Sequence, residues 1–552
     1  MIRAWFKTGA PWVWLNAAAV SLSLIMVFGL LVLIAVRGLG HFWPAQVAGF
    51  EYVEKGSKQA STVIGEIVEQ QVLKPELAKA AGYTPEQAAQ GLTQYLVKTG
   101  NRDISGMDFR WLLGKDIKQT DYPEILMVME RREWGNFYGY LQSIKQDGTV
   151  VAQGTGAWVS LDARMQRTLD IFAQIKDIEK HDIGAINYQL ERLRLKQRKF
   201  ELEDKLDAQA KRSIAAEKAG FEKKYQALQA NLAALNQKIR RDSLVAKTAN
   251  GQEVEIALEK VVLYYQPNAM NIVQKIGHYF SKVWEFLSDD PREANTEGGV
   301  FPAIFGTVMM VMIMAVIVTP LGVIAAVYMR EYAKQDVMTR IIRIAVNNLA
   351  GVPSIVYGIF GLGFFVYILG GNIDALFFPE ALPAPTYGTP GMLWASLTLA
   401  LLTLPVVIVS TEEGLSRIPK SIREGSLALG ATKAETLWRT VLPMASPAMM
   451  TGLILAVARA AGEVAPLMLV GVVKLAPTLP MDGNFPFMHL DRKFMHLGFH
   501  IYDVGFQSPN VEAARPLVYA TALLLVMVII GLNLFAVSIR NRLREKYRAL
   551  EN

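Results

Sequence analysis

The sequence predicts an all-α polytopic membrane protein with six transmembrane helices, joined to an α+β domain outside the membrane that contains a long helical hairpin. Two observations predict this fold class. Six long runs are almost free of charge, and each reaches or exceeds the roughly 20 residues that cross a bilayer as a helix. A long, strongly charged segment separates the first run from the second. The overall values of 52% hydrophobic and 19% charged residues therefore average two unlike parts.

One uncharged run lies near the N-terminus and five lie in the C-terminal half. They are residues 17–36, 298–329, 344–373, 381–411, 446–473 and 516–539. Arg459 and Glu463 alone interrupt the fifth run. The first run is longer than the roughly 7–15 apolar residues of a signal-peptide core, and no obvious small-x-small cleavage site follows it. We therefore expect a retained membrane anchor.

Lysine and arginine in short loops predict the orientation, because cytoplasmic loops carry an excess of these residues. They precede the first run, lie between the second and third and between the fourth and fifth, and follow the sixth, whereas residues 370–390 contain none. The residues are Arg3, Lys7, Arg330, Lys334, Arg340, Arg343, Arg417, Lys420, Arg423, Lys433, Arg439, Arg540, Arg542, Arg544, Lys546 and Arg548. Both termini and the loop around Glu424 are expected in the cytoplasm, and residues 38–297 on the far side.

Four regions follow from this topology. We expect a cytoplasmic N-terminus and first span at 1–37, an exported domain at 38–297, a five-helix membrane domain at 298–545 and a cytoplasmic tail at 546–552. The net charge of +7 reflects the loops and needs no nucleic acid as a partner. The chain has no cysteine, which excludes disulfides, thiol catalysis and cysteine metal sites.

The exported domain shows strand patterning in two places. Residues 124–142 are rich in apolar and aromatic residues, and Trp134, Tyr138 and Tyr140 share one parity, as on one face of a strand. Asp147-Gly148 is then a hairpin signal. Residues 254–265 are again rich in Val, Ile and Tyr.

Between these strands, residues 164–241 predict two long helices that fold back as an antiparallel coiled coil. Apolar residues alternate spacings of four and three along 186–200 and again along 221–239, which is the seam of a coiled coil. No Gly or Pro occurs between Ala185 and Ala219, and we place the reversal within 207–220. Two interpretations of the hairpin stay open. It contacts a partner outside the membrane, such as a solute receptor, or it packs only on itself or on a sister subunit.

The loop before the fifth run combines Glu424, Gly430 and the pair Leu442-Pro443. Glu424 is expected at a helix start, where its charge complements the helix dipole. Gly430 permits a bend that other residues resist, and Pro443 suits the first turn of a new helix. This helix–glycine–helix loop is suited to being held by a soluble partner. The alternative is an ordinary amphipathic connector.

Arg459 and Glu463 lie four residues apart, which places them on one face of the fifth predicted span. A charged side chain at mid-membrane costs about 2.5–3.5 kcal/mol on insertion scales, so such residues usually line a pathway or pair with each other. A guanidinium can hold an oxyanion through two parallel hydrogen bonds. We expect Arg459 to contact a passing anion; a static ion pair joining two helices is the alternative.

Three histidines, His489, His496 and His500, cluster in the predicted outer loop. No carboxylate pattern completes a metal motif, so no metal site is expected, and 485–506 is interpreted as an aromatic amphipathic segment at the outer surface. No phosphate-binding glycine loop occurs, since Gly114-Lys115 is followed by Asp116 without an upstream glycine. We therefore expect a non-catalytic chain without a cofactor of its own.

Three stretches together resemble the permease subunits of the bacterial phosphate ABC importer. They are residues 350–358 (AGVPSIVYG), 423–432 (REGSLALGAT) and 458–467 (ARAAGEVAPL). The last stretch resembles the PstA type more than its PstC-type partner. In the docking loop, Gly425 and Ser426 replace the two alanines of the family pattern. The resemblance covers about 298–545, and the preceding part resembles the long N-terminal extension of some proteobacterial members.

The resemblance implies an ABC type I importer permease fold in the bacterial inner membrane. It implies a PstC-type second permease, a PstB-type ATPase dimer that binds ATP and magnesium, and a periplasmic PstS-type phosphate-binding protein, with inorganic phosphate as substrate and membrane lipid around the chain. On this resemblance Arg459 and Glu463 serve phosphate passage, and Glu424, Gly430, Leu442 and Pro443 serve coupling to the ATPase. The alternatives are a permease for another oxyanion and an anchored coiled-coil sensor. The sensor is disfavoured because only short segments face the cytoplasm.

Overall fold

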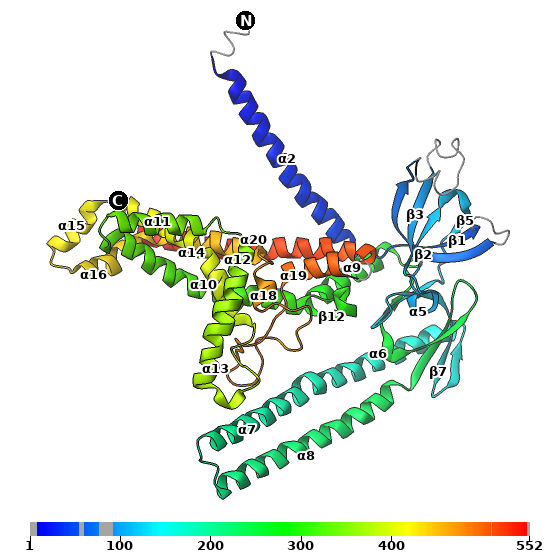
Figure 1. Ribbon diagram of the computed structural model, residues 1–552. Helices are drawn as coiled ribbons and strands as arrows, with labels where there is room; N and C mark the ends of the chain where they lie inside the picture. The colour runs from blue at the N-terminus through cyan, green and yellow to red at the C-terminus, as the bar shows by residue number, and fades with distance from the viewer. Residues whose placement is uncertain (1–7, 54–59, 75, 77–91, 509–510, 549–552) are drawn as a thin grey trace. The chain divides into compact units, whose positions relative to one another are not determined.

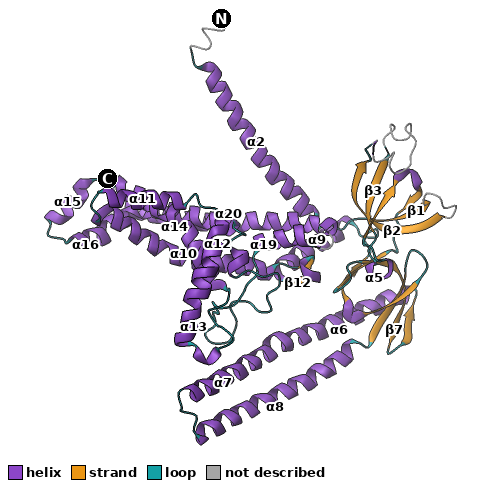
Figure 2. Ribbon diagram, viewed as in Figure 1, coloured by secondary structure: helices purple, strands orange, loops and turns teal. Residues whose placement is uncertain are grey.

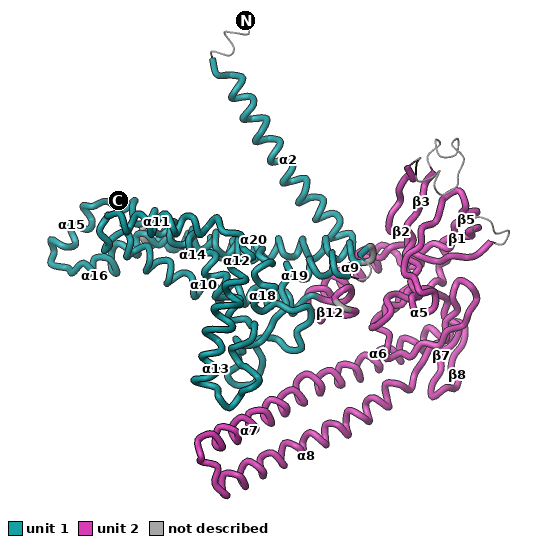
Figure 3. Tube along the Cα trace, viewed as in Figure 1, with its two compact units in different colours: residues 1–41, 300–552 teal, residues 42–299 magenta. Residues whose placement is uncertain are grey.

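The computed structural model describes residues 8–53, 60–74, 76, 92–508 and 511–548. Arg3 and Lys7, two of the residues that predict the orientation, lie outside this range. The chain divides into two compact units (Figure 3). We call residues 1–41 with 300–552 the helical unit, and residues 42–299 the mixed unit, because strands occur mainly in the second (Figure 2).

Within the described residues, six helices are long and apolar enough to cross a membrane, in agreement with the predicted number. They cover 10–40, 301–332, 354–377, 392–417, 433–462 and 514–546. The helices of this unit are α2 (Ala10–Gly40), α10 (Phe301–Val327), α11 (Val337–Leu349), α12 (Ser354–Phe360), α13 (Gly371–Phe377), α14 (Met392–Arg417), α15 (Lys420–Ala428), α16 (Lys433–Thr436), α17 (Leu442–Gly462), α18 (Leu467–Val470), α19 (Leu497–Tyr502) and α20 (Val511–Arg548) (Figure 1).

Proline explains three of the differences between the predicted and the observed span boundaries. The third span begins at Ser354 instead of 344, because Pro353 separates it from α11. The fourth begins at Met392, after a segment with prolines at 379, 383, 385 and 390. The fifth ends at Gly462, because Pro466 cannot donate the backbone hydrogen bond that a continuing helix needs.

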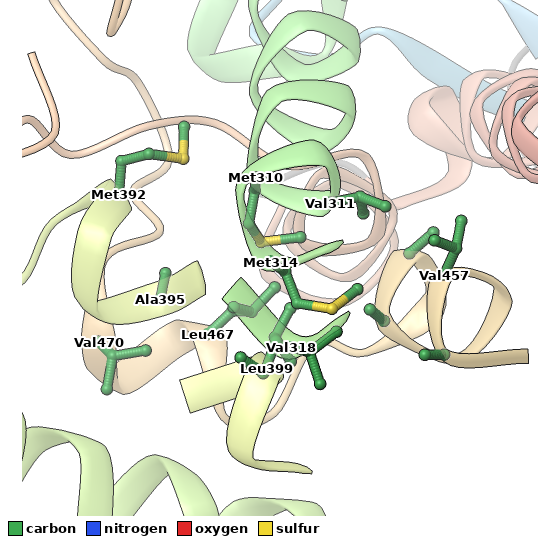
Figure 4. Close-up of a cluster of buried hydrophobic side chains, with 14 of the residues drawn as sticks. Met310, Val311, Met314, Val318, Met392, Ala395, Leu399, Val457, Leu467 and Val470 are labelled. Atoms are coloured by element: carbon green, nitrogen blue, oxygen red, sulfur yellow. The ribbon is translucent and has the colours of Figure 1, made fainter. Parts of the chain in front are cut away.

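The helical unit is held together by α10, α14, α17 and α20, which pack in that order, while α2 packs on α20. Its main core combines methionine, valine, leucine and alanine side chains from α10, α14, α17 and α18 (Figure 4). Glycines allow the close approach: a Cβ on Gly322 would lie 2.6 Å from Val407, and one on Gly452 2.7 Å from Ser410. Small residues at helix contacts are typical of membrane bundles.

The mixed unit contains two antiparallel sheets with the orders β4-β3-β2-β1-β5 and β10-β9-β7-β6-β11, and β8 pairs with β7. The strands are β1 (Val47–Val53), β2 (Ala60–Val72), β3 (Thr93–Lys98), β4 (Phe109–Leu113), β5 (Ile117–Asp121), β6 (Met127–Arg131), β7 (Phe137–Gln146), β8 (Thr149–Gln153), β9 (Asp242–Lys247), β10 (Glu253–Ala257) and β11 (Val261–Tyr265), followed by the short pair β12 (Pro291–Arg292) and β13 (Glu297–Gly298).

The hairpin predicted at Asp147-Gly148 is confirmed, with φ of 50° and 78° at the two residues, as a type I′ turn requires. The region 254–265 forms β10 and β11, as expected from its composition. One prediction is wrong. Trp134 does not share a strand with Tyr138, because it lies in the turn between β6 and β7 with a φ of 73°. Tyr138 is buried inside the unit.

The predicted helical hairpin is formed by α6 (Thr155–Asp177), a π-helical segment at 178–183, α7 (Gly184–Leu202) and α8 (Ala208–Ile239). Ile186, Leu193, Leu235 and Ile239 of the expected seam are buried. The chain reverses at 203–207, earlier than predicted. Asp204 adopts a φ of 50°, and the Asp207 side chain accepts from the Ala210 N–H and begins α8 without any glycine or proline.

Candidate functional site

The glycine of the loop before the fifth span forms the predicted bend. Helix α15 ends at Ala428, and Gly430 adopts a φ of 90°. The Gly430 N–H donates to the Leu427 carbonyl (3.0 Å) and the Ala431 N–H to the Ser426 carbonyl (3.3 Å). These two bonds form a Schellman motif, which needs a left-handed residue at the position of Gly430. The bend is therefore a helix stop for which glycine is the suitable residue.

Glu424 occupies the fifth of nine positions in α15 and is exposed, so the expectation that it begins a helix is wrong. Pro419 precedes the helix instead. After the bend, Thr432 and Glu435 form a capping box that begins α16. Helical backbone then continues to Gly462 through a π-helical segment at 437–441. Leu442 and Pro443 lie inside this continuous helical stretch, where the π-helical segment passes into α17, so the expectation that Pro443 begins a new helix is wrong.

The bend is anchored to the end of the second span by ionic contacts that sequence reasoning missed. The Arg423 guanidinium donates to Glu331 Oε1 (2.9 Å) and to the carbonyls of Ile418 (2.6 Å) and Leu415 (2.8 Å). Lys433 Nζ donates to the Glu331 carbonyl oxygen. The sequence did carry a signal for this contact: Glu331 and Arg423 have opposite charges and lie near the predicted cytoplasmic ends of the second and fourth spans. These bonds hold α15 and α16 as one rigid element.

This element presents apolar side chains outward. Leu429 is 91% exposed and Trp438 is 76% exposed. Leu427, two residues before Leu429, has nearly half of its surface exposed. The opposite side packs into a core of Leu415, Ile418, Leu437 and Val441 and neighbouring side chains. Large apolar side chains that project from a surface held in place are suited to insert into pockets of another protein.

Arg459 and Glu463 lie at the other end of the same helix. Arg459 is in the last turn of α17, and Glu463 is its C-cap residue with extended backbone. The pair therefore does not lie within one continuous helix at mid-span, as the spacing predicted, because the helix ends before Pro466. The Arg459 Nε lies 3.5 Å from Glu463 Oε1, and the two side chains are 34% and 20% exposed. The ion pair is thus open to the surface of this chain.

Two helix breaks meet beside this pair. A Cβ on Gly358 of α12 would lie 2.7 Å from the Cα of Pro466, so the second half of α12 contacts the segment that follows Glu463. The Tyr357 hydroxyl donates to the Leu349 carbonyl (2.6 Å), which satisfies a backbone group at the end of α11. Broken helices expose backbone groups that lipid cannot satisfy, and they are tolerated where they line a cavity or a pathway.

The histidines do not form a metal site, since the described residues include no group of three or more possible ligands. His489 bonds to Asp482 (2.9 Å). His496 and His500 are buried, and burial lowers the pKa of His496 to about 3 and that of His500 to about 4. The prediction that 485–506 lies at the outer surface is wrong in part. Its exposed aromatic residues are Phe485, Phe487 and Phe506, whereas residues 494–498 are buried.

Known proteins resemble the helical unit. A family model described as a binding-protein-dependent transport system inner membrane component matches residues 318–548. The phosphate transport system permease protein PstA of Mycobacterium leprae is 36% identical over 276 residues, which are 49% of this chain and 81% of that protein. The chain belongs to the PstA permease family. PstA 1 of Mycobacterium tuberculosis is 36% identical over 245 residues, 44% of this chain and 71% of that protein.

A probable phosphate transport system permease protein PstA of Methanocaldococcus jannaschii is 31% identical over 254 residues, covering 45% of this chain and 78% of that protein. Membership in the PstA family confirms the predicted ABC type I permease fold and makes this chain a multi-pass membrane protein and a transport component. The family model begins within α10 and ends within α20, so the mixed unit lies outside it.

Proposed function

We propose that this PstA-family chain is the permease subunit of an ATP-driven importer for inorganic phosphate. It forms half of the translocation pathway together with a PstC-type permease, and it receives phosphate from a periplasmic PstS-type binding protein. A PstB-type ATPase dimer binds ATP and magnesium and docks on the element 420–441. The names of the relatives support phosphate as the substrate.

The proposed location is a bacterial inner membrane, with both termini and the element 420–441 in the cytoplasm and the mixed unit in the periplasm. The distribution of lysine and arginine supports this orientation. Arg423 and Lys433, which belong to the cytoplasmic excess, are also the residues that bind Glu331 at the end of the second span. Positive charge on this side therefore has a structural as well as a topological role.

The observation that carries the proposal is that one helical stretch, 433–462, joins the docking element to the Arg459–Glu463 pair. At 1.5 Å per residue, Lys433 and Arg459 are about 40 Å apart along the axis. A displacement of the Gly430 bend by an ATPase is thus transmitted along this continuous helical stretch to the guanidinium. Arg459 binds the passing oxyanion, and Glu463 holds the guanidinium when no anion is present.

Leu429 tests the docking step. Leu429→Asn leaves a side chain that is almost fully exposed, so the fold is retained, but it removes the apolar group available to the ATPase. We expect weaker co-purification of the ATPase and slower phosphate uptake in vesicles. Leu202→Asn, the same change at an exposed residue of the mixed unit, is the control. Equal ATPase recovery with both variants would contradict the docking proposal.

Removing both charges distinguishes anion binding by Arg459 from a static ion pair between Arg459 and Glu463. A static pair is dispensable when both partners become neutral, so the double variant Arg459→Met/Glu463→Gln would then take up phosphate better than Arg459→Met alone. If Arg459 binds the anion, both variants fail equally while ATPase association stays normal. Uptake of labelled phosphate, with sulfate as competitor, measures this and also separates phosphate from another oxyanion.

A further inference from the structure

Helix α9 (Ile272–Ser288) of the mixed unit turns its apolar side outward. A capping box of Asn271 and Gln274 begins the helix. Its large exposed side chains are 44–72% exposed and recur every four residues, which places them on one face. They are Ile272, Val273, Ile276, Phe280 and Trp284, and we call them the α9 apolar face.

Lys282 and Glu285 of α9 point the other way, into the unit. Lys282 Nζ bonds to Glu130 of β6 (2.7 Å) and to Glu285 (2.6 Å), and Glu285 in turn pairs with Arg292 (2.8 Å). Each of these four side chains is less than one fifth exposed. A helix on the surface of a soluble domain has the opposite arrangement, with its apolar stripe inward and its charges in water. The surroundings of the α9 apolar face are therefore apolar.

The two connections of the mixed unit to the first and second spans identify these surroundings. The first span ends at Gly40, and the ring of Phe42 contacts Tyr279 (6.2 Å) and Phe286 (5.2 Å) of α9. At the other end of the unit, the Gly299 N–H donates to the Asp290 carbonyl (3.1 Å), directly after α9, and the second span begins at Phe301. The chain from Gly299 to Phe301 is two residues long, so the start of the second span lies within about 8 Å of Gly299. Both connections to the bilayer thus run along α9.

We propose that the α9 apolar face lies in the lipid headgroup region of the membrane, on the side that carries the mixed unit. Trp284 and Phe280 are residue types that favour this interface, and an interfacial helix buries its apolar face about 5–10 Å deep at the boundary with the acyl chains. The α9 apolar face carries no charged side chain that would oppose this burial. Helix α9 therefore attaches the mixed unit to lipid, in addition to its two covalent connections.

The absence of cysteine from the sequence makes a direct test simple. Single-cysteine variants of the full chain, assembled with its partner subunits in vesicles of phosphatidylethanolamine and phosphatidylglycerol, are labelled with a nitroxide. Phe280→Cys and, independently, Val273→Cys report on the α9 apolar face. Ile25→Cys in the first span is the lipid reference, and Lys218→Cys in α8 is the water reference; both positions are exposed. Collisions with oxygen and with a water-soluble nickel chelate are measured for each.

We expect the ratio of oxygen to nickel collisions at Phe280→Cys and Val273→Cys to be several-fold above that at Lys218→Cys and close to that at Ile25→Cys. Nickel accessibility equal to that at Lys218→Cys would place the α9 apolar face in water and overturn the proposal. Protection from both reagents would show a protein partner on this face and would overturn it equally. Neither result depends on which solute is transported.

Discussion

The buried threonine hydroxyls of the helical unit and the buried charges of the mixed unit find their partners in different ways. In the helical unit, the buried hydroxyls of Thr307, Thr398, Thr403 and Thr521 each donate to the carbonyl four residues earlier in their own helix, at 2.7–2.9 Å. In the mixed unit, buried charges pair across elements. Asp242 at the start of β9 is 1% exposed and forms ion pairs with arginines of α6, and Arg131 of β6 binds Asp103 (2.8 Å).

The difference follows from what each side chain requires. A threonine hydroxyl finds an acceptor within its own helix, so it is buried without help from a neighbour. A carboxylate or guanidinium must be compensated by a partner that the fold brings to it. The helical unit meets the same requirement where it buries charge: Asp374 accepts from the Tyr387 and Gly388 N–H groups, and Asp503 pairs with Lys474 (3.1 Å). Arg459 and Glu463 lie beside a helix break and stay partly exposed. The predictions below test the contrast, beginning with the largest effect.

Removing a buried charge from the mixed unit has the largest expected effect. Asp242→Ala leaves Arg164, Arg167 and Arg241 close together without their shared carboxylate. We expect the free energy of unfolding of this unit to fall by about 3–5 kcal/mol. Amide hydrogen exchange in β9, measured by mass spectrometry, reports the change. The control is Glu191→Ala, which removes an exposed pair with Arg194 and is expected to cost about 0–1 kcal/mol. Similar exchange rates in both variants would refute the contrast.

Glu297 of the mixed unit and two buried histidines of the helical unit are expected to contribute pH dependence of opposite sign. Burial raises the pKa of Glu297 in the mixed unit from 4.5 to about 7. The unfolded carboxyl loses its proton first, so the stability of the folded unit decreases as pH rises from 4.5 to 7 and is constant above. The difference reaches about 2–3 kcal/mol. Glu297→Gln should abolish this dependence in thermal unfolding at several pH values; an unchanged profile would contradict the burial of a protonated carboxyl.

In the helical unit, burial lowers the pKa of His496 and His500, so the unfolded histidines accept protons before the folded ones do. The stability that these neutral side chains provide is complete above 6.5 and decreases as pH falls toward the folded pKa values of about 3 and about 4. Acid should therefore destabilise the helical unit through these two histidines, and replacing both with glutamine should reduce this loss in thermal unfolding at several pH values.

Backbone conformation gives a smaller effect. Gly430→Ala places a Cβ on a residue with a φ of 90°, which costs about 1–2 kcal/mol. The helical Gly425, five residues earlier, has open space around its Cβ direction, so Gly425→Ala should stabilise α15 by up to about 1 kcal/mol. Thermal unfolding and ATPase co-purification measure both. If Gly425→Ala reduced ATPase recovery as much as Gly430→Ala, the left-handed bend would not be the determining feature.

The smallest effect is expected for a buried hydroxyl of the helical unit. Thr398→Val keeps the shape of the side chain and removes a hydrogen bond whose acceptor, the Trp394 carbonyl, lies in the same helix. We expect a loss below about 1 kcal/mol, because helical carbonyls already accept backbone N–H groups. Detergent-induced unfolding measures it. A loss as large as that for Asp242→Ala would mean that this hydroxyl bridges elements.

Much of the candidate site was predictable because its signals are local. The bend at Gly430 was expected from one glycine between two helical segments, whereas the helix start expected at Pro443 lies at Lys433, where Thr432 and Glu435 form the capping box. The prediction that Glu424 begins a helix was wrong. The preference of an acidic side chain for a helix start is weak, about 1 kcal/mol, and Pro419 determines where this helix begins. The Arg423–Glu331 bond could not be derived, since these residues are 92 positions apart and meet only when the spans pack.

The sequence by itself determined the number of spans, the coiled-coil hairpin and the glycine bend. Apolar length and heptad spacing suffice for these, because a helix in lipid must satisfy its backbone within itself. Only the tertiary structure decided where Arg459 and Glu463 lie relative to the helix break, which arginines surround Asp242, and that Lys282 and Glu285 of α9 point inward. Each of these depends on which side chains distant segments bring together, and the free energy of a charge is set by those neighbours rather than by its own position in the chain.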